Sequence, residues 1–246
     1  RARELVEQIR QWSLLPEAVY HFPAPEALFY DRAAWPQQTV RERVSILGML
    51  ARPELHARFH DLRRSAIVVT SVSALLPKSV PPHLLAQHVR QVRVGERLNL
   101  NDFLSALLES GYQPAAVVEE IGFFSRRGGI VDLFSPGQPA PVRIELFGDE
   151  VDSLRFFDPA TQRSLDTIAT ITICPASEAM PAYGSRAAAL VRQLDFSRLQ
   201  AMSRQRWQQD LESLEFGESF RGIEFYLPCL YPEPASLLHY LSPDWL

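Results

Sequence analysis

The residues that could perform chemistry are few in this chain, and a nucleotide site is the first to consider. A phosphate-binding loop needs a glycine-rich turn closed by Gly-Lys-Ser or Gly-Lys-Thr, because backbone amides and the lysine contact the phosphates. The only lysine among the 246 residues is Lys78, which lies in Leu-Leu-Pro-Lys-Ser with no glycine nearby. These residues therefore contain no phosphate-binding loop, and only a segment upstream of Arg1 could supply one.

Two further groups of side chains have the composition of a metal or catalytic site. His56 and His60 stand four residues apart on an expected helix, but no third ligand accompanies them at a recognisable spacing, so we interpret them as part of a solvated helix face. Asp149, Glu150 and Asp152 gather at an expected hairpin, where paired carboxylates could exchange protons with a substrate. Because Gly-Asp is a common turn sequence, hairpin formation explains this cluster without catalysis.

Nucleophilic side chains show no catalytic pattern either. Ser71 and Ser73 are not part of a Gly-x-Ser-x-Gly motif, and Cys174 and Cys229 lie far apart with no histidine beside them in sequence. Two cysteines without a Cys-x-x-Cys spacing fit a reducing compartment, and we expect both to be buried as small apolar residues. We therefore expect no catalytic residue, no metal site and no cofactor in this chain.

One polar surface is more distinctive than these isolated groups. In the expected strand Val142–Phe147 the apolar residues alternate, so they face one side of the sheet. This alternation leaves Arg143, Glu145 and Phe147 together on the other side. An arginine, a carboxylate and an aromatic ring on one face form a surface that can bind another protein.

Two arginines precede two glycines in the neighbouring hairpin. Gly128 and Gly129 have no side chains and would let a partner approach the backbone beside Arg126 and Arg127. Arginine and aromatic anchors are each worth about 2 kcal/mol or more when buried at an interface. The residues alone leave three interpretations open: a docking surface, an ordinary solvated sheet face with Gly-Gly as a bulge, and a face covered by a helix that buries Phe147.

Composition places the chain among globular proteins without a strong preference for nucleic acid. Hydrophobic residues make up 46% of the sequence, enough for a core, and the formal net charge is −4. Only residues 1–86 carry more basic than acidic groups, so a concentrated basic surface for DNA is not expected elsewhere. No apolar run approaches the roughly 18 residues of a membrane helix, and no signal peptide is recognisable. We expect a cytoplasmic monomer that does not enter membranes.

The first third of the chain has an α/β pattern. Apolar residues at helical spacing begin at once, over residues 5–12. A second helix is expected to start at Thr39, where Thr39 and Glu42 form a capping box, and a third to cover residues 53–63. The continuous run Ala66–Thr70 predicts a strand buried on both faces of a parallel sheet. The strand that should precede the first helix is missing, so we expect a fragment whose first domain is truncated at its N-terminus.

Beyond a proline-rich boundary the pattern changes to that of a small antiparallel α+β domain. A helix capped by Asn101-Asp102 is expected to turn Phe103, Leu104, Leu107 and Leu108 inward. The expected strands are Val89–Val94, Ala116–Ile121, Phe123–Arg127, Ile130–Phe134, Val142–Phe147, Val151–Phe157 and Ile168–Ile173. A mainly helical return segment follows, with one helix expected over residues 187–194. We predict an α/β first domain over 1–86, the inserted domain over 87–174 and the return segment over 175–246.

Three stretches in fixed order carry a family likeness. Gly122–Phe134, Pro141–Arg155 and Phe157–Ser164 closely resemble the N-terminal module of bacterial transcription-repair coupling factors. Shorter similarities extend the resemblance over nearly the whole chain, at Phe22-Pro23, Glu26, Tyr30-Asp31-Arg32, Glu42-Arg43, Val69–Leu76 and Gly222–Pro228.

The excision-repair helicase UvrB shares this architecture and is the rival within the resemblance. UvrB carries a long aromatic hairpin for damaged DNA between the positions corresponding to Tyr30-Asp31 and the following helix. Here only residues 32–38 fill that interval before Thr39, so a coupling factor is favoured.

The resemblance implies a RecA-like first domain that has lost its nucleotide site and an inserted domain that binds UvrA. It places the UvrA contacts on Arg127, Arg143, Glu145 and Phe147, and it leaves the role of Arg126 open. The motor, which uses ATP and magnesium, and the polymerase-binding domain of such proteins lie outside these residues. The implied function is a non-catalytic docking module that recruits UvrA to stalled RNA polymerase in nucleotide excision repair.

Two further expectations concern the parent protein. Other parts of the parent would contact RNA polymerase and DNA, and they could mask the docking face. The alternative to a docking module is the front half of a UvrB-like DNA-dependent ATPase that contacts damaged DNA.

Overall fold

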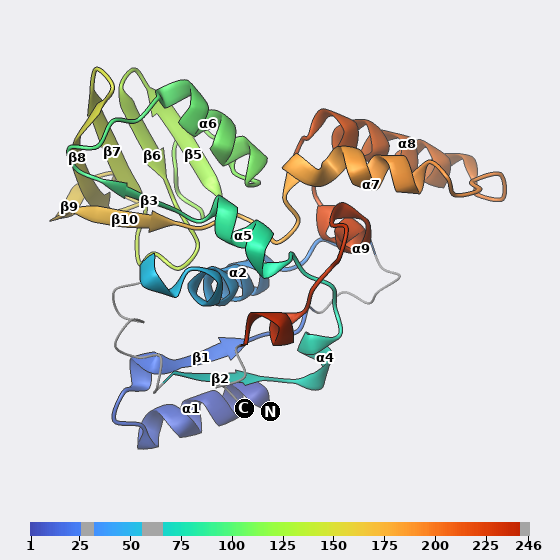
Figure 1. The fold of residues 1–246 in the computed structure, drawn as a ribbon, viewed down its shortest axis with the longest axis horizontal. Coiled ribbons are helices and arrows are strands. Elements are labelled where there is room, and N and C mark those ends of the chain that lie inside the picture. The colour runs from blue at the N-terminus through green and yellow to red at the C-terminus, as the bar shows by residue number, and fades with distance from the viewer. Residues whose placement is uncertain (26–31, 56–65, 242–246) are drawn as a thin grey trace.

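The computed structural model describes residues 1–25, 32–55 and 66–241, and it has a mixed α/β architecture with parallel and antiparallel strand pairs (Figure 1). Its helices are α1 (Ala2–Trp12), α2 (Gln37–Ala51), α4 (Val72–Leu75), α5 (Pro82–His88), α6 (Leu100–Glu109), α7 (Gly184–Val191), α8 (Ala201–Phe216) and α9 (Leu227–Leu230). Its strands are β1 (Val19–Phe22), β2 (Ile67–Thr70), β3 (Arg90–Arg93), β4 (Gln113–Pro114), β5 (Phe123–Arg127), β6 (Ile130–Leu133), β7 (Val142–Phe147), β8 (Glu150–Phe157), β9 (Ser164–Ile168) and β10 (Thr170–Ile173). This architecture agrees with the predicted α/β class.

The first layer is a parallel pair of strands covered by α1. β1 pairs with β2 so that Val19 lies opposite Ile67, and Val6 of α1 packs on Val19 and Val69. The sequence pattern does not predict β1. The prediction that β2 is buried on both faces is wrong. Val69 packs against α1, but Ile67 is 42% exposed.

Helix α2 lies at the centre of the molecule, but its start differs from the prediction. The helix begins at Gln37, directly after Pro36, and Thr39 is buried within it without capping. Glu42 does not close a capping box; one of its carboxylate oxygens lies 3.1 Å from Nδ1 of His21 on β1. The side chain that would cap a helix in an isolated peptide therefore ties α2 to the parallel strands.

The largest core surrounds α2 and contains a fully buried ion pair. Nη2 of Arg43 donates to Oε2 of Glu178 at 3.1 Å, and both side chains are only 1% exposed. Nη1 of Arg43 donates to the carbonyl oxygens of Pro23 (3.1 Å) and Ala74 (3.2 Å), and the guanidinium lies 4.2 Å from the centre of the Phe22 ring. One side chain thus joins the segment after β1, helix α4 and the return segment.

The second core lies beneath a six-stranded sheet of order β4-β5-β6-β7-β8-β9. β4 and β5 are parallel, whereas the other neighbouring strands are antiparallel. Helix α6 and the antiparallel pair β3–β10 cover one face of this sheet through Phe103, Leu107, Val92, Ile171 and Ile173 (Figure 1). The cap of α6 is Asn99, whose side chain accepts from the amides of Asn101 and Asp102, so the predicted cap is wrong. Phe103 and Leu107 are buried and Leu104 packs against the same core, as predicted, whereas Leu108 is 46% exposed, so its predicted inward position is wrong.

The other face of the sheet is partly covered by an irregular segment. Residues 116–121, predicted as a strand, contain no strand in the structure, because Val118 packs across the sheet onto Phe134 and Phe157. The strand β9 was not predicted. The remaining predicted strands of this region are present with small differences at their ends.

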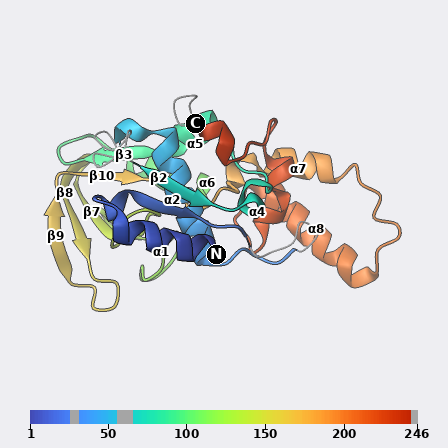
Figure 2. The same cartoon turned by 90° about the horizontal axis from the view of Figure 1, so that it is seen from below.

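Helices α7 and α8 run side by side and extend away from the rest of the chain (Figures 1 and 2). A methyl group added at Gly184 would lie 2.2 Å from the carbonyl oxygen of Leu214, so a glycine permits this close contact between the helices. The predicted helix over 187–194 corresponds to α7, which begins at Gly184 and ends at Val191.

A buried carboxyl in the return segment predicts a pH-dependent stability. Oε2 of Glu224 is buried and has no hydrogen-bond partner among the described residues, and burial raises the pKa of this group to about 7 from its ordinary 4.5. Because the folded state binds the proton more tightly than the unfolded chain does, the stabilising contribution of Glu224 is complete below pH 4.5 and is lost as the pH rises through 7. Glu224→Gln should therefore stabilise the protein by on the order of 3 kcal/mol above pH 7 and by little at pH 4.5.

Urea denaturation of both proteins across this pH range checks the expectation. Glu233→Gln is the matched control, because Glu233 is exposed. A difference between Glu224→Gln and the parent chain that stays constant with pH would contradict the predicted titration.

Several predictions fall outside the described residues or are left open. Glu26, Tyr30, Asp31, His56, His60 and the end of the helix predicted over 53–63 lie outside the described residues. Within the described part of the chain, no helix is long and apolar enough to cross a membrane. The domain boundaries at residues 86 and 174 remain predictions.

Candidate docking surface

Strand β7 presents the polar face that alternation predicts. Val142 and Ile144 are buried in the core beneath the sheet, whereas Arg143 and Glu145 are partly exposed on the opposite side. Phe147 is 84% exposed at the end of the strand. The face is therefore open to solvent at Phe147, and no helix among the described residues buries this ring.

The strand register places Arg127 on the same face and Arg126 on the other. Residues directly opposite each other in neighbouring strands point to the same side of a sheet. Arg127 lies opposite Ile130, which in turn lies opposite Glu145. Arg126 instead lies opposite Val131, whose side chain belongs to the core beneath the sheet. The structure thus brings Arg127, Arg143, Glu145 and Phe147 to one face, which we call the docking face.

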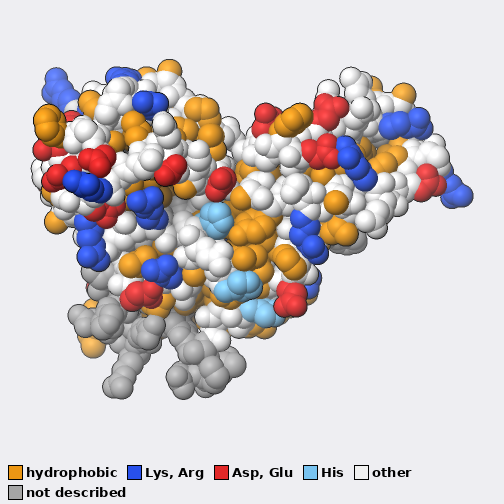
Figure 3. Space-filling view, turned by 45° about the horizontal axis from the view of Figure 1, so that its top comes forward, with side chains coloured by type: hydrophobic (Ala, Val, Ile, Leu, Met, Phe, Trp, Pro, Cys, Tyr) orange, Lys and Arg blue, Asp and Glu red, His pale blue; other side chains and the backbone are white. Residues whose placement is uncertain are grey.

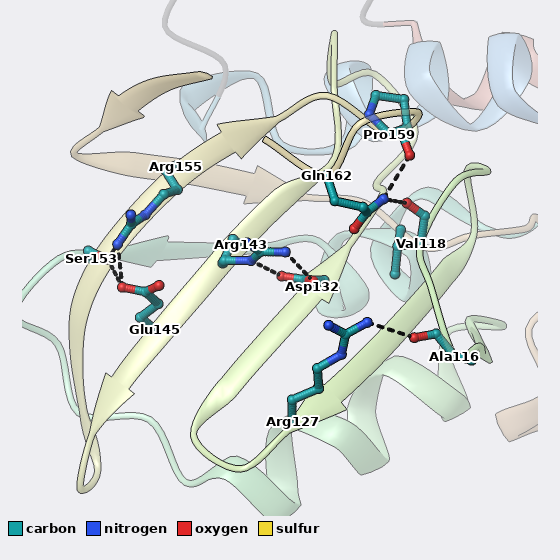
Figure 4. A network of polar contacts seen from close by, with 10 residues as sticks. All are labelled: Ala116, Val118, Arg127, Asp132, Arg143, Glu145, Ser153, Arg155, Pro159 and Gln162. Carbon is teal, nitrogen blue, oxygen red and sulfur yellow. Dashed lines mark hydrogen bonds and ion pairs between the residues drawn. The ribbon is translucent and has the colours of Figure 1, made fainter. Parts of the chain in front are cut away.

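Arg143 is held by a buried carboxylate in a two-point contact. Its Nε donates to Oδ1 of Asp132 at 2.7 Å and its Nη2 donates to Oδ2 at 2.8 Å (Figure 4). Asp132 is 2% exposed, and the guanidinium carbon of Arg143 lies 4.9 Å from the centre of the Phe157 ring. The hydrogen bonds that Arg143 donates to Asp132 raise the pKa of Arg143, so this side chain is always charged.

Glu145 has its own fixed partners on β8. Its Oε2 accepts a hydrogen bond of 2.8 Å from the hydroxyl of Ser153 and a second one from Nη2 of Arg155 (Figure 4). The same nitrogen of Arg155 also donates to the Ser153 hydroxyl at 3.0 Å. Glu145, Ser153 and Arg155 therefore form a closed triangle of polar contacts beside the Arg143–Asp132 pair.

The irregular segment borders the docking face along β5. Nη2 of Arg127 donates to the carbonyl oxygen of Ala116 at 3.1 Å, and the Gln162 amide donates to the carbonyls of Val118 (3.4 Å) and Pro159 (2.7 Å) (Figure 4). The part of the sheet that stays open lies beyond this border, over β7 and β8.

The two glycines of the β5–β6 turn have separate structural roles. Gly128 has φ +61°, a left-handed conformation that suits glycine in a tight turn. A side chain at Gly129 would lie 2.9 Å from the carbonyl oxygen of Leu146, so the backbone that approaches this glycine belongs to β7. The register shift of this region lies between Glu145 and Leu146.

The other candidate groups do not assemble into sites in the described part of the chain. Asp149, Glu150 and Asp152 are exposed around Gly148, and no group of three or more His, Cys, Asp or Glu side chains among the described residues could hold a metal ion. The backbone oxygen of Asp149 accepts from the amide of Leu98 at 2.7 Å, as expected for a structural turn. The face in Figure 3 shows acidic and basic side chains interspersed over the lobe of the six-stranded sheet.

The cysteines are unsuited to nucleophilic chemistry. Cys174 is buried, as predicted, and burial raises the pKa of its thiol to about 12. Cys229 is only partly buried, so the prediction of full burial is wrong there, although burial still raises the pKa of this thiol. A raised thiol pKa leaves little reactive thiolate at neutral pH.

Sequence reasoning missed three members of the polar network, which are Asp132, Ser153 and Arg155. Asp132 is the one charged residue within the predicted strand Ile130–Phe134, and this isolation in an apolar strand is a signal for a buried partner. Its pairing with Arg143 follows only from the cross-strand register.

Comparison with known protein families finds a match for the segment that contains this sheet and its polar network. Residues 91–178 match the model of the UvrB interaction domain family, and this segment contains the whole docking face. Residues 91–178 are therefore similar to the UvrB interaction domains.

Several transcription-repair-coupling factors are similar to the chain. It is 32% identical over 241 residues to the transcription-repair-coupling factor of Myxococcus xanthus, covering 96% of the chain and 19% of that protein. It is 34% identical over 221 residues to that of Bacillus subtilis strain 168 (83% and 19%) and 37% identical over 160 residues to that of Staphylococcus haemolyticus (65% and 13%). The predicted resemblance to this family is confirmed over most of the chain, which spans about a fifth of the length of the first two relatives.

Proposed function

We propose that this chain is a non-catalytic docking module of a transcription-repair coupling factor, and that its docking face binds UvrA. The observation that carries the proposal is the joint placement of Arg127, Arg143, Glu145 and Phe147 on one open sheet face within a UvrB interaction domain. An exposed aromatic ring beside fixed charged groups combines the residue types that dominate protein interfaces. Through this contact the parent protein would recruit UvrA to RNA polymerase stalled at a lesion.

The first domain would act as a scaffold in this role. We propose that α1, β1, β2 and α2 belong to a RecA-like domain without a nucleotide site. The parallel strand pair and the lack of a Gly-Lys-Ser or Gly-Lys-Thr sequence among the 246 residues support this proposal. Docking requires no cofactor in this chain, while ATP and magnesium would serve the motor of the parent protein.

Truncating Phe147 should weaken UvrA binding without disturbing the fold. The ring is 84% exposed, so Phe147→Ala removes no core contact, whereas an aromatic anchor buried at an interface is worth about 2 kcal/mol. We expect the Kd for purified UvrA, measured by titration calorimetry, to rise about 30-fold. Arg127→Ala should weaken binding as well.

The matched control is Phe216→Ala, because Phe216 is 79% exposed on α8, away from the sheet. Equal affinities of the parent chain and Phe147→Ala would refute the proposed contact set. Stronger UvrA binding by this chain than by the full-length protein would indicate that the parent masks the docking face. Nucleotide binding by this chain would favour the UvrB-like ATPase instead.

A further inference from the structure

We propose that Asp132 and Arg155 are positioning residues of the docking face, with Asp132 fixing Arg143 and Arg155 fixing Glu145 for the partner. This inference rests on the proposed function, because it assigns a role to residues that support the proposed contact set. Neither residue belongs to that set. Each acts through a neighbour on an adjacent strand.

Asp132 is placed to orient Arg143 and cannot reach a partner itself. Its side chain is 3% exposed, and each of its two carboxylate oxygens receives one nitrogen of Arg143, at 2.7 and 2.8 Å. The Phe157 ring lies against the guanidinium and is fully buried. A planar guanidinium gripped along its Nε–Nη2 edge can no longer rotate freely.

The contact with Asp132 leaves Nη1 of Arg143 available to a partner. Nη1 makes no hydrogen bond with the residues that the structure describes, and the Arg143 side chain is 20% exposed. A carboxylate or carbonyl oxygen of a partner can therefore bond to the Nη1–Nη2 edge while Asp132 keeps the other edge.

Arg155 and Ser153 orient Glu145 in the same way. Both donate to Oε2 of Glu145, and Oε1 accepts no hydrogen bond from the described residues. Arg155 also lies directly opposite Arg143 in the strand register, where two arginines repel each other. The contact of Arg155 with Glu145 offsets this repulsion and turns the guanidinium away from Arg143.

In the free chain the four charged side chains of this network form two ion pairs, so their charges balance without a partner. Asp132 and Arg143 form one pair, and Glu145 and Arg155 form the other. Fixed side chains lose less conformational freedom on binding than free ones, so this arrangement favours affinity through preorganisation. Removing either positioning residue should weaken UvrA binding on the order of tenfold, mainly through faster dissociation.

A double-mutant cycle tests whether Asp132 acts through Arg143. Asp132→Asn keeps the shape of the side chain and removes its charge, and Arg143→Gln retains a donor for Asp132. We expect Asp132→Asn to weaken UvrA binding about tenfold in the parent chain and to have no further effect in the Arg143→Gln variant. Arg155→Met and Glu145→Gln form the corresponding cycle for the second pair. Additive losses in both cycles would overturn the proposal, because a general effect on the fold would act equally in both backgrounds.

A measurement without UvrA separates this inference from the proposed function. In the free chain, hydrogen exchange of the Arg143 Nε–H, followed by NMR, should be slow and should accelerate in Asp132→Asn, while Arg127 is unaffected. Absence of UvrA binding by the parent chain would refute the proposed function, and the exchange measurement would still decide the role of Asp132. Unchanged exchange of Arg143 in Asp132→Asn would overturn the positioning role.

Discussion

Arg143→Glu is expected to destabilise the protein by about 3–5 kcal/mol, although the substitution lies on a proposed binding face. The reason is Asp132, whose buried carboxylate has Arg143 as its two-point partner. The variant removes this partner and places a second carboxylate beside the first, so a buried charge is left uncompensated. A substitution on a solvated sheet face would ordinarily leave the fold intact, and the buried partner of Arg143 argues against that outcome here.

Urea denaturation with circular dichroism measures this loss. Arg97→Glu is the matched control, because it makes the same charge change in an exposed pair with Asp149 (3.9 Å) and should cost at most about 1 kcal/mol. Equal stabilities of Arg143→Glu and the parent chain would contradict the structural role of Arg143. A clean test of docking therefore uses Phe147 and Arg127, whose side chains are exposed.

Arg43→Met is expected to cost about 3–5 kcal/mol for a similar reason at a deeper position. It leaves Glu178 buried and unpaired, and it removes the donors of the Pro23 and Ala74 carbonyls. Because domains are stable by only about 5–15 kcal/mol, this loss should unfold a large part of the protein in mild urea.

The double variant Arg43→Met with Glu178→Met distinguishes a lost ion pair from a lost packing contact. It removes both charges, so it should be more stable than Arg43→Met alone. Arg52→Met, in the exposed pair with Glu54, is the surface control and should cost at most about 1 kcal/mol. A double variant that is as unstable as the sum of the two single variants would show that the charges do not depend on each other.

The docking face is the part of the structure that periodicity predicts best. In a strand, side chains alternate between two faces whatever surrounds them, so the order Val142, Arg143, Ile144, Glu145 determines which residues share a side. The assignment of these residues as UvrA contacts stays a prediction. Their positions in the sheet show that they share a face, but they do not identify the partner.

The partners of these side chains could not be predicted, because pairing depends on register. The separation of Arg143 and Asp132 by a turn of unknown shape hides the fact that they lie opposite each other. A shift of one residue in that turn would send Asp132 to the core side instead. The roles of Asp132 and Arg155 therefore emerge only from the folded sheet.

The wrong element predictions share one physical cause, which is that tertiary contacts overrode local signals. Glu42 matches a capping box with Thr39, but its carboxylate contacts His21, which comes from another element. The segment 116–121 has the composition of a strand, but Val118 gains a buried position by crossing the sheet. Local pattern cannot weigh contacts between residues that lie far apart in sequence.

Because Arg126 and Arg127 point to opposite faces of the sheet, insertions and deletions in β5 should be constrained. Deleting the codon of Arg127 would move Arg126 into its place if the turn kept its length, but every earlier residue of β5 would then change to the other face of the sheet. Loss or gain of one residue in the strand should therefore be selected against more strongly than most substitutions within it. Changes in pairs restore the alternation, so length variation among natural sequences of this hairpin should favour even numbers.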